Sequence, residues 1–385
     1  MSLTFHWFLP TYGDSRNLIP GGHGTSMRGD RPATLRYLNQ VAAAAEQAGF
    51  ESVLTPTGAW CEDAWLTTAM LVQETERLKF LVALRPGLLS PTLAAQMAST
   101  FQWQSEGRLL LNVVTGGEPR EQLAYGDALN KADRYARCGE FLSVVRQLWA
   151  GEEPVTFTGD HVFVENATLQ RRPDPVPPIY FGGSSPEAGA VAAEHADTYL
   201  TWGEPPAAVA EKVDWIRRLA SQRGRSISYG IRLHVIARDT SEEAWAEAGR
   251  LLRTIPEGEI ERVQAGLAQS ESEGQKRMRD LHRGRDRDLR SLEVSPNLWS
   301  GVGLVRGGAG TALVGSHEEV SERISEYADL GIDHFILSGY PHLEEAWQFA
   351  EGVVPALSRR GLIADRAPGG PASNGEPVGV PFAAS

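Results

Sequence analysis

Short apolar runs alternate with longer segments of helical periodicity along most of the chain. Runs of three to six residues rich in β-branched and aromatic side chains predict strands, and apolar residues that recur every three or four positions predict helices. The predicted strands are residues 4–9, 52–55, 80–84, 109–114, 179–182, 198–202, 231–235 and 335–337. The predicted helices are residues 33–48, 62–74, 92–104, 130–149, 186–195, 206–221, 241–253 and 343–357.

Continuous alternation of strand and helix predicts a parallel sheet, because parallel neighbours need a crossover connection. Eight such units in a chain of this length predict a closed (β/α)8 TIM barrel rather than an open sheet. We therefore expect residues 1–366 to form a single barrel domain with insertion segments. One insertion is a short β-rich excursion at residues 152–169.

The stretch between the seventh helix and the eighth strand interrupts this alternation. Residues 256–295 are charged and weakly apolar, and a glycine-dense segment follows at residues 302–310. Long connections in compact domains are usually functional lids or disordered segments. We interpret residues 256–310 as a mobile lid over the barrel mouth; the alternative is a solvated insertion without a role. Residues 367–385 are rich in Pro, Gly and Ala and predict a flexible C-terminal tail.

Composition limits the partners of the protein and its compartment. The 385 residues carry a formal net charge of −12, which argues against a nucleic-acid or anionic-membrane partner. The two cysteines make no disulfide framework or zinc-type spacing. The start of the chain has no signal-peptide pattern, and no apolar run approaches membrane-spanning length. We expect a cytoplasmic enzyme without a bound metal.

Polar residues at the predicted strand ends are the first candidates for chemistry, because active sites of such barrels lie there. Arg232 and His234 alternate with apolar neighbours, so both should face the barrel interior. A buried guanidinium is costly unless it meets an anion, here a substrate or, alternatively, a core carboxylate. Tyr340 and His342 follow the eighth strand, where the alternative is a capped turn.

Two further strand ends carry candidate groups. Residues 182–185 read Gly-Gly-Ser-Ser before a predicted helix, and free backbone N–H groups at a helix start suit a phosphate. The alternative is an ordinary turn and cap. Cys61 lies near the start of another helix, where the pKa of a thiol can be lowered. The alternative is a small buried apolar residue.

Several segments together resemble one family, the two-component, reduced-FMN-dependent alkanesulfonate monooxygenases of the bacterial luciferase-like group. The resemblance runs from about residue 4 to about residue 357 and is most specific around Arg232, Arg306 and Tyr340. The matching segments are residues 8–11, 61–65, 80–86, 112–116, 180–185, 199–206, 230–236, 296–299, 303–315 and 338–346.

This resemblance implies a reaction and partners. An NAD(P)H-dependent FMN reductase supplies reduced FMN, and the barrel uses it with O2 to cleave the C–S bond of an alkanesulfonate, giving an aldehyde and sulfite. It also implies a homodimer or homotetramer. A sulfonate and the FMN phosphate are both anionic, so arginines and backbone N–H donors at the predicted strand ends agree with this chemistry.

The resemblance also assigns roles to residues. Cys61 would lie beside the flavin, and Arg232 would hold the sulfonate or stabilise the flavin-peroxide. His234 would act as acid or base with a pKa in the useful range. Arg306 would arrive from the lid, and Tyr340 would donate a proton beside His342. The residues that would line the FMN pocket are Asn112, Thr115, Tyr135, Gly183, Ser184, Ser185 and Trp202.

Three features depart from the family pattern, all on loops that follow predicted strands. Tyr12 stands where the family has a histidine, Ala59-Trp60 replaces an arginine and adds an aromatic, and the loop at residues 17–30 is longer than usual. A phenol carries no positive charge near neutral pH. We expect Tyr12, Trp60 and Arg306 to contact the substrate and Trp60 to reshape its channel.

Other functions remain compatible with the sequence. One is a related luciferase-like monooxygenase specific for methanesulfonate, a dialkyl sulfone or a substrate without sulfur. Another is a deazaflavin-dependent oxidoreductase on the same barrel, which transfers hydride and needs no O2. A flavin-binding or storage protein without turnover is disfavoured by the inward-facing polar residues, which are costly to bury without a use.

Overall fold

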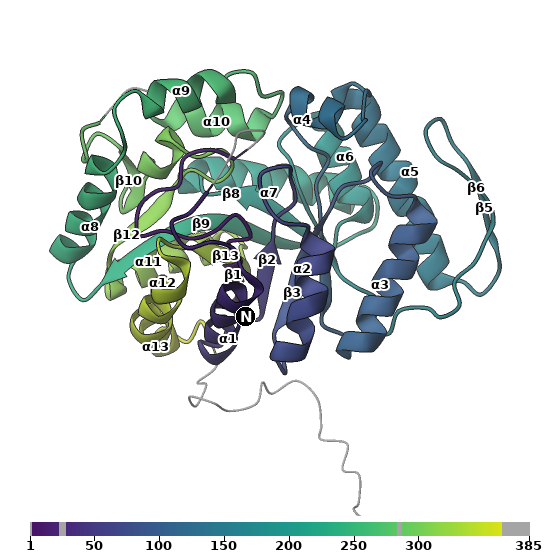
Figure 1. Ribbon diagram of the computed structural model, residues 1–385, viewed down its shortest axis with the longest axis horizontal. Coiled ribbons are helices and arrows are strands. Elements are labelled where there is room, and N and C mark those ends of the chain that lie inside the picture. The colour runs from purple at the N-terminus through teal and green to yellow at the C-terminus, as the bar shows by residue number, and fades with distance from the viewer. Residues whose placement is uncertain (1, 23–27, 283–286, 364–385) are drawn as a thin grey trace, which may run out of the picture.

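The computed structural model describes residues 2–22, 28–282 and 287–363, and eight parallel strands close into a barrel within them (Figure 1). Each strand pairs with the next around the ring, and the β8–β9 pairing closes it. The predicted (β/α)8 barrel is therefore confirmed. Its strands are β1 (Thr4–Phe8), β2 (Ser52–Thr55), β3 (Lys79–Leu84), β4 (Leu109–Val113), β7 (Ile179–Gly182), β8 (Thr198–Trp202), β9 (Ser228–Arg238) and β13 (His334–Ser338).

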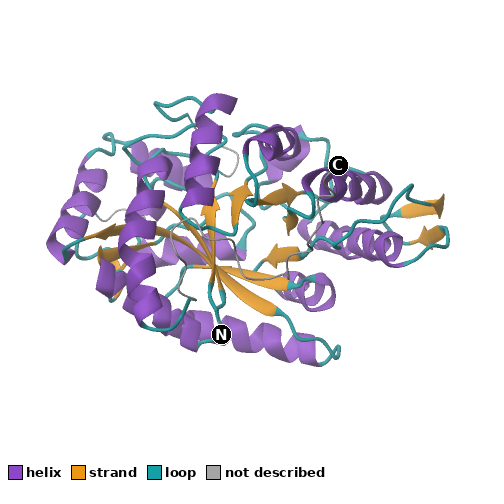
Figure 2. Ribbon diagram, turned by 90° about the horizontal axis from the view of Figure 1, so that it is seen from below, coloured by secondary structure: helices purple, strands orange, loops and turns teal. Residues whose placement is uncertain are grey.

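Helices surround the strands, as the view from below shows (Figure 2). Ser90, Asn130 and Ser185 each accept a backbone N–H at the start of a helix, which satisfies a donor left over there. No helix in the described ranges is long and apolar enough to cross a membrane. The outer helices are α1 (Leu35–Gln47), α2 (Ala64–Leu71), α3 (Pro91–Ser105), α5 (Lys131–Ala150), α6 (Pro186–His195), α7 (Pro206–Ser221), α8 (Ser241–Arg253), α11 (His317–Asp329), α12 (His342–Gln348) and α13 (Val354–Arg359).

Strand residues alternate between two apolar cores because successive side chains point to opposite faces. Trp7, Phe80 and Phe181 belong to the large core between strands and helices. Phe8, the next residue after Trp7, belongs to the core inside the barrel, as does Ile336. The barrel interior is therefore filled by apolar side chains, and polar side chains gather at the C-terminal ends of the strands.

Strand β9 is longer than its neighbours and changes partner along its length. Its first five residues pair with β8, and its last five pair with β12 (Ala312–Ser316). Two short antiparallel strands, β10 (Glu293–Ser295) and β11 (Leu298–Trp299), extend the sheet beyond β12. The sequence prediction left β12 and α11 unassigned, because β12 is short and follows a glycine-dense run.

The segment predicted to be a lid contains helices. α9 (Glu259–Leu267) and α10 (Glu273–His282) lie together on one side, near β8 and the N-terminal loop (Figure 1). Gln264 on α9 donates to the carbonyls of Gly303 and Leu304, in the 3-10 turn Gly301–Leu304. The mobility of this lid stays a prediction. Residues 283–286 and the predicted tail at 367–385 lie outside the described residues.

Smaller elements complete the fold. The predicted β-rich excursion is confirmed as a hairpin of β5 (Val155–Thr158) and β6 (Phe163–Ala167) that projects from the body (Figure 1). The short helix α4 (Pro119–Ala124) follows β4, a 3-10 turn (Val72–Glu74) extends α2, and a π-helical turn (Phe349–Val353) joins α12 to α13.

Candidate active site

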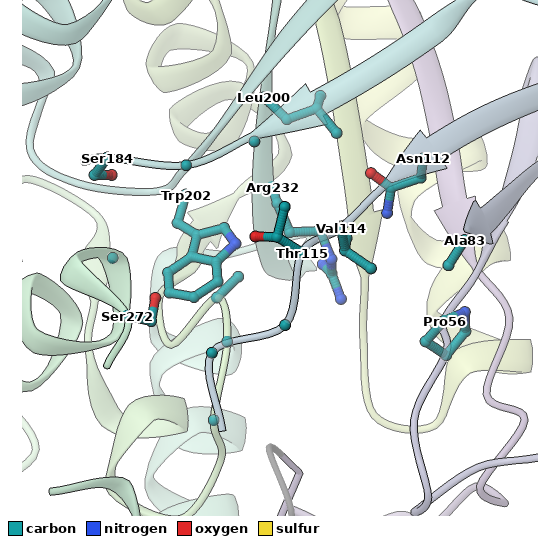
Figure 3. Close-up of a pocket in the computed structure, with 18 of the residues that line it drawn as sticks. Pro56, Ala83, Asn112, Val114, Thr115, Ser184, Leu200, Trp202, Arg232 and Ser272 are labelled. Carbon is teal, nitrogen blue, oxygen red and sulfur yellow. The ribbon is translucent and has the colours of Figure 1, made fainter. Parts of the chain in front are cut away.

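A cavity of about 290 Å³ opens at the C-terminal ends of the barrel strands (Figure 3). This size is close to the lower end of small-molecule sites, roughly 300 Å³. Its walls come from the ends of β1 to β4 and β7 to β9, the starts of α6 and α10, and the loop that contains Arg306. Barrel enzymes bind substrates at this end, so the cavity is the candidate active site.

One part of the wall combines backbone N–H groups, hydroxyl groups and the start of a helix. Gly183, Ser184 and Ser185 lead into α6, and the Ser185 hydroxyl accepts the Ala188 N–H at 3.3 Å. A Cβ atom on Gly183 would lie 2.5 Å from the Ala188 Cβ, so only glycine fits at this turn. Tyr135 on α5 lies beside this turn, where its hydroxyl would be 3.3 Å from a Cβ on Gly183. The helix start adds partial positive charge to these donors.

The remaining residues predicted for the cofactor also line the cavity. Asn112 comes from the end of β4, Thr115 from the loop after it, and Trp202 from the end of β8; Figure 3 shows all three side chains around the same space. Gly274 on α10 packs against the Trp202 indole, where a Cβ would come within 3.0 Å of the ring. The structure therefore brings all seven predicted cofactor residues together.

Two guanidinium groups form the cationic part of the site. Arg232 and Arg306 both line the cavity, and their Cζ atoms lie 4.6 Å and 5.8 Å from the Phe8 ring centre. Arg232 donates to the Leu233 carbonyl and the Ser338 hydroxyl, at 2.7 and 3.0 Å, and pairs with no carboxylate of the described residues. Burial, together with the nearby Arg306 charge, lowers the pKa of Arg232 to about 9. An anion in the cavity would relieve this unfavourable charge.

His234 lies behind Arg232 and does not reach the cavity. The Ser338 hydroxyl lies 2.8 Å from its Nδ1, and its Nε2 lies 3.1 Å from the Ala309 carbonyl. Because a carbonyl only accepts, Nε2 carries the proton and Nδ1 accepts from Ser338. Burial lowers the pKa of His234 well below its usual value, and both cations lower it further. The prediction of an acid or base with a useful pKa is therefore wrong: His234 is a neutral support for Ser338 and Arg232.

Tyr340, Tyr12 and His342 form a buried aromatic group beside Arg306. The Arg306 Cζ lies 4.7 Å from the Tyr12 ring centre and 6.0 Å from that of Tyr340. Burial raises the pKa of both phenols, so they stay protonated. None of the three aromatic residues is part of the cavity lining.

His342 is fixed by Asp14, an acid that the sequence reasoning missed. Asp14 is fully buried and accepts from the His342 backbone N–H at 2.8 Å, from its ring Nδ1 at 2.9 Å, and from the Tyr37 hydroxyl at 2.6 Å. The Nε2 atom of His342 is buried and meets no hydrogen-bond partner in the described chain. The carboxylate thus sets both the ring orientation and the tautomer of His342.

The loop of Tyr12 and the loop of Arg306 are joined through their backbones. The Gly21 N–H donates to the Val305 carbonyl at 2.8 Å, and the Gly307 N–H donates to the Gly21 carbonyl at 3.0 Å. Arg306 is therefore held in a backbone bridge rather than on a free loop. This pairing joins parts of the chain that are far apart in sequence.

Cys61 follows Trp60 of the cavity wall but is not part of the lining, and its thiol stays protonated. Its Sγ lies 3.7 Å from the Pro56 carbonyl and 3.5 Å from that of Gly58. Burial raises the pKa of its thiol to about 12. The prediction of a lowered thiol pKa is wrong, because Asp63 rather than Cys61 caps α2 and the sulfur faces carbonyl oxygens.

Several lining residues were missed by the sequence reasoning. Arg85 and Glu121 form a buried ion pair at 3.2 Å in the cavity wall. Lys212 also lines it and is paired with Glu204, which Arg277 of α10 contacts as well. Arg85 follows β3, and this position at a strand end could have identified it as a candidate site residue. Glu121 and the α10 residues carry no such signal, because only the folded loops bring them to the cavity.

The profile of the luciferase-like monooxygenase family matches residues 3–334, and the chain belongs to this family. Membership assigns the chain to the oxidoreductases. The solved structures that it resembles include riboflavin lyase RcaE, with a TM-score of 0.76 at 21% identity over 96% of this chain and 94% of that one.

Two monooxygenases have similar structures. Long-chain alkane monooxygenase LadA has a TM-score of 0.76 at 20% identity, over 95% of this chain and 93% of that one. EDTA monooxygenase EmoA from Chelativorans sp. BNC1 has a TM-score of 0.73 at 19% identity, over 94% of this chain and 95% of that one. At such identities the likeness establishes the fold, and the substrate has to be argued from the site.

Proposed function

We propose that the protein is a two-component flavin monooxygenase that cleaves the C–S bond of alkanesulfonates. The observation that carries this proposal is Arg232, a buried guanidinium in the cavity wall that, among the residues the structure describes, donates only to neutral oxygens. Buried charges without a partner are costly, so such a group favours an anionic ligand. A sulfonate is ionised at every physiological pH, and Arg306 adds a second cation beside the same ring of Phe8.

FMN fits the opposite part of the cavity. Gly183, Ser184 and Ser185 would hold its phosphate at the start of α6, with Tyr135 beside them. Asn112 and Trp202 would line the space for its ring system. When bound in its reduced form, FMN supplies two electrons with which O2 is activated. Overall, an alkanesulfonate, O2 and reduced FMN give an aldehyde, sulfite, water, a proton and oxidised FMN.

The side chains of the protein have distinct parts in this reaction. Arg232 and Arg306 bind and orient the sulfonate. Ser338 and the neutral His234 hold the Arg232 guanidinium in place. The Tyr340 hydroxyl keeps its proton, since burial raises its pKa, and it lies beside Arg306 outside the cavity lining, so it would help to position that arginine. A separate NAD(P)H-dependent reductase supplies reduced FMN, and the chain works as a homodimer or homotetramer.

Sulfite release tests this function directly. The purified protein is mixed with reduced FMN, O2 and a series of sulfonates from methanesulfonate to decanesulfonate. We expect at least one sulfonate to release sulfite above the level of a mixture without the protein, which corrects for the direct oxidation of free reduced FMN by O2. Absence of sulfite with every sulfonate, together with an oxygenated product from a sulfone, would assign another monooxygenase substrate and overturn the sulfonate proposal. Absence of sulfite together with hydride transfer from a reduced deazaflavin would overturn the proposal of a monooxygenase.

Gly183→Ala tests the phosphate-binding turn. The added Cβ would lie 2.5 Å from Ala188, so the turn must move away from its position at the start of α6. We expect binding of reduced FMN, followed by anaerobic fluorescence titration, to weaken roughly tenfold, or about 1.4 kcal/mol. Gly139→Ala is the matched control, because its Cβ would meet nothing closer than 4.0 Å. Equal affinities in the two variants would show that the phosphate binds elsewhere.

A further inference from the structure

Trp60 lies in the cavity wall next to Tyr12 of the first loop. It lines the cavity, and its ring centre lies 5.6 Å from that of Tyr12, which is buried. Tyr12 in turn lies 6.1 Å from Phe8 at the end of β1. Phe8 and Trp60 thus line the cavity, and Tyr12 packs against both rings from outside the lining. We call this group of three rings the aromatic wall.

The position of Trp60 is fixed by its neighbours. The adjacent Ala59 N–H donates to the Glu121 carboxylate at 2.9 Å, and Glu121 is paired with Arg85 at 3.2 Å. Gly58 leaves room for the indole to fold back, since a Cβ there would lie 2.4 Å from the Trp60 Nε1. These contacts hold the backbone before Trp60, and the indole packs against Gly58 and Tyr12, so its bulk can limit the shape of a ligand.

The aromatic wall also runs past both cations of the site. The Arg232 Cζ lies 4.6 Å from the Phe8 ring centre, and the Arg306 Cζ lies 4.7 Å from that of Tyr12. Tyr12 is the ring that separates Arg306 from Trp60. Arg232, Arg306 and Trp60 line the same cavity, so an alkyl chain that leaves a sulfonate held by these arginines can extend along Phe8 toward the indole.

We propose that Trp60 closes the substrate end of the cavity and restricts the enzyme to compact sulfonates. This inference rests on the proposed sulfonate function and names the size class of its substrate. Short-chain sulfonates fit between the arginines and the indole, whereas long-chain sulfonates have to displace a ring that is fixed from behind. In hydrophobic pockets a misfit of one methylene changes kcat/KM by roughly 10- to 200-fold.

The test compares kcat/KM for sulfite release from ethanesulfonate and from octanesulfonate. We expect the wild type to favour ethanesulfonate. Trp60→Ser should raise the ratio of octanesulfonate to ethanesulfonate at least about tenfold, and Trp60→Phe should restore part of the preference. Trp103→Ser is the control, because Trp103 is exposed on α3 and lies outside the cavity lining.

The outcomes separate this inference from the function on which it rests. If wild type and Trp60→Ser both release sulfite with the same ratio of kcat/KM for octanesulfonate to ethanesulfonate, the role of Trp60 is overturned. The proposed sulfonate function is then unaffected. A wild type that favours octanesulfonate would overturn it as well. If neither protein releases sulfite from any sulfonate, the proposed function fails and this inference fails with it.

Discussion

Arg232→Met should lower kcat/KM for sulfite release about 100- to 1,000-fold, the loss typical of removing one donor that stabilises charge in an active site. Methionine roughly fills the space of the arginine side chain and removes its charge. The sulfonate then loses a buried guanidinium that has no carboxylate partner of its own in the described chain. Arg232→Lys should recover only part of the activity, because an ammonium cannot donate in the forked geometry of a guanidinium.

The same substitution has an unusual expected effect on stability. The Arg232 charge is buried beside Arg306, and these two factors lower its pKa to about 9. The charged side chain therefore reduces the free energy of unfolding. Replacing a buried charge by an apolar side chain of similar volume is often neutral or stabilising. We expect the thermal midpoint of Arg232→Met to equal or exceed that of the wild type. A variant that loses activity together with stability would instead indicate a structural role.

Lowering the pH from 7 to 5 should destabilise the protein strongly, because burial lowers the pKa of several histidines. The pKa values of His6 and His234 fall well below 6.5, and those of His195 and His282 fall to about 4. Below pH 6.5 the unfolded chain binds protons that these folded sites do not. The stability that they contribute is therefore complete above pH 6.5 and lost as the pH falls, by about 2 kcal/mol for each fully shifted histidine at pH 5.

Two carboxyl groups, Glu118 and Glu345, act in the opposite direction, because burial raises the pKa of both. Burial raises the pKa of Glu118 to about 7, so the folded protein binds a proton there while the unfolded chain does not, and this offsets about one histidine. The net result should be a clear drop of the thermal midpoint between pH 7 and pH 5. His6→Gln should make the drop smaller, because it removes one shifted site at the bottom of the barrel, where His6 contacts Ser52 at 2.7 Å. A midpoint that stays constant or rises would contradict the expectation.

Periodicity sufficed to predict the barrel because its units are regular. The bounds of β7, α6, β8, α7 and α8 agree with the predicted ranges residue for residue. The strand β12 was missed because its five residues, Ala312–Ser316, follow a run of glycines that reads as a loop. Its place beside the outer half of β9 is set by tertiary pairing, which a local pattern does not contain.

Sequence patterns predict the site residues that lie at strand ends. They do not predict properties that depend on burial by distant segments. Arg232 follows from alternation along a strand, and the Gly183 turn follows from its place before a helix. The pKa values of Cys61 and His234 were predicted wrongly, because desolvation depends on atoms that distant segments bring in. Asp14 escaped notice for the same reason, since its partner His342 is remote in sequence.

The backbone bridge between Gly21 and the Arg306 loop has a consequence for engineering and for divergence within the family. The loop that carries Tyr12 and the loop that carries Arg306 share two main-chain hydrogen bonds, so neither is an independent module. A first loop transplanted alone from a relative would lose its register against residues 305–307. Substrate range in this barrel should therefore be exchanged between relatives by grafting the two loops as one unit, although they lie near opposite ends of the chain.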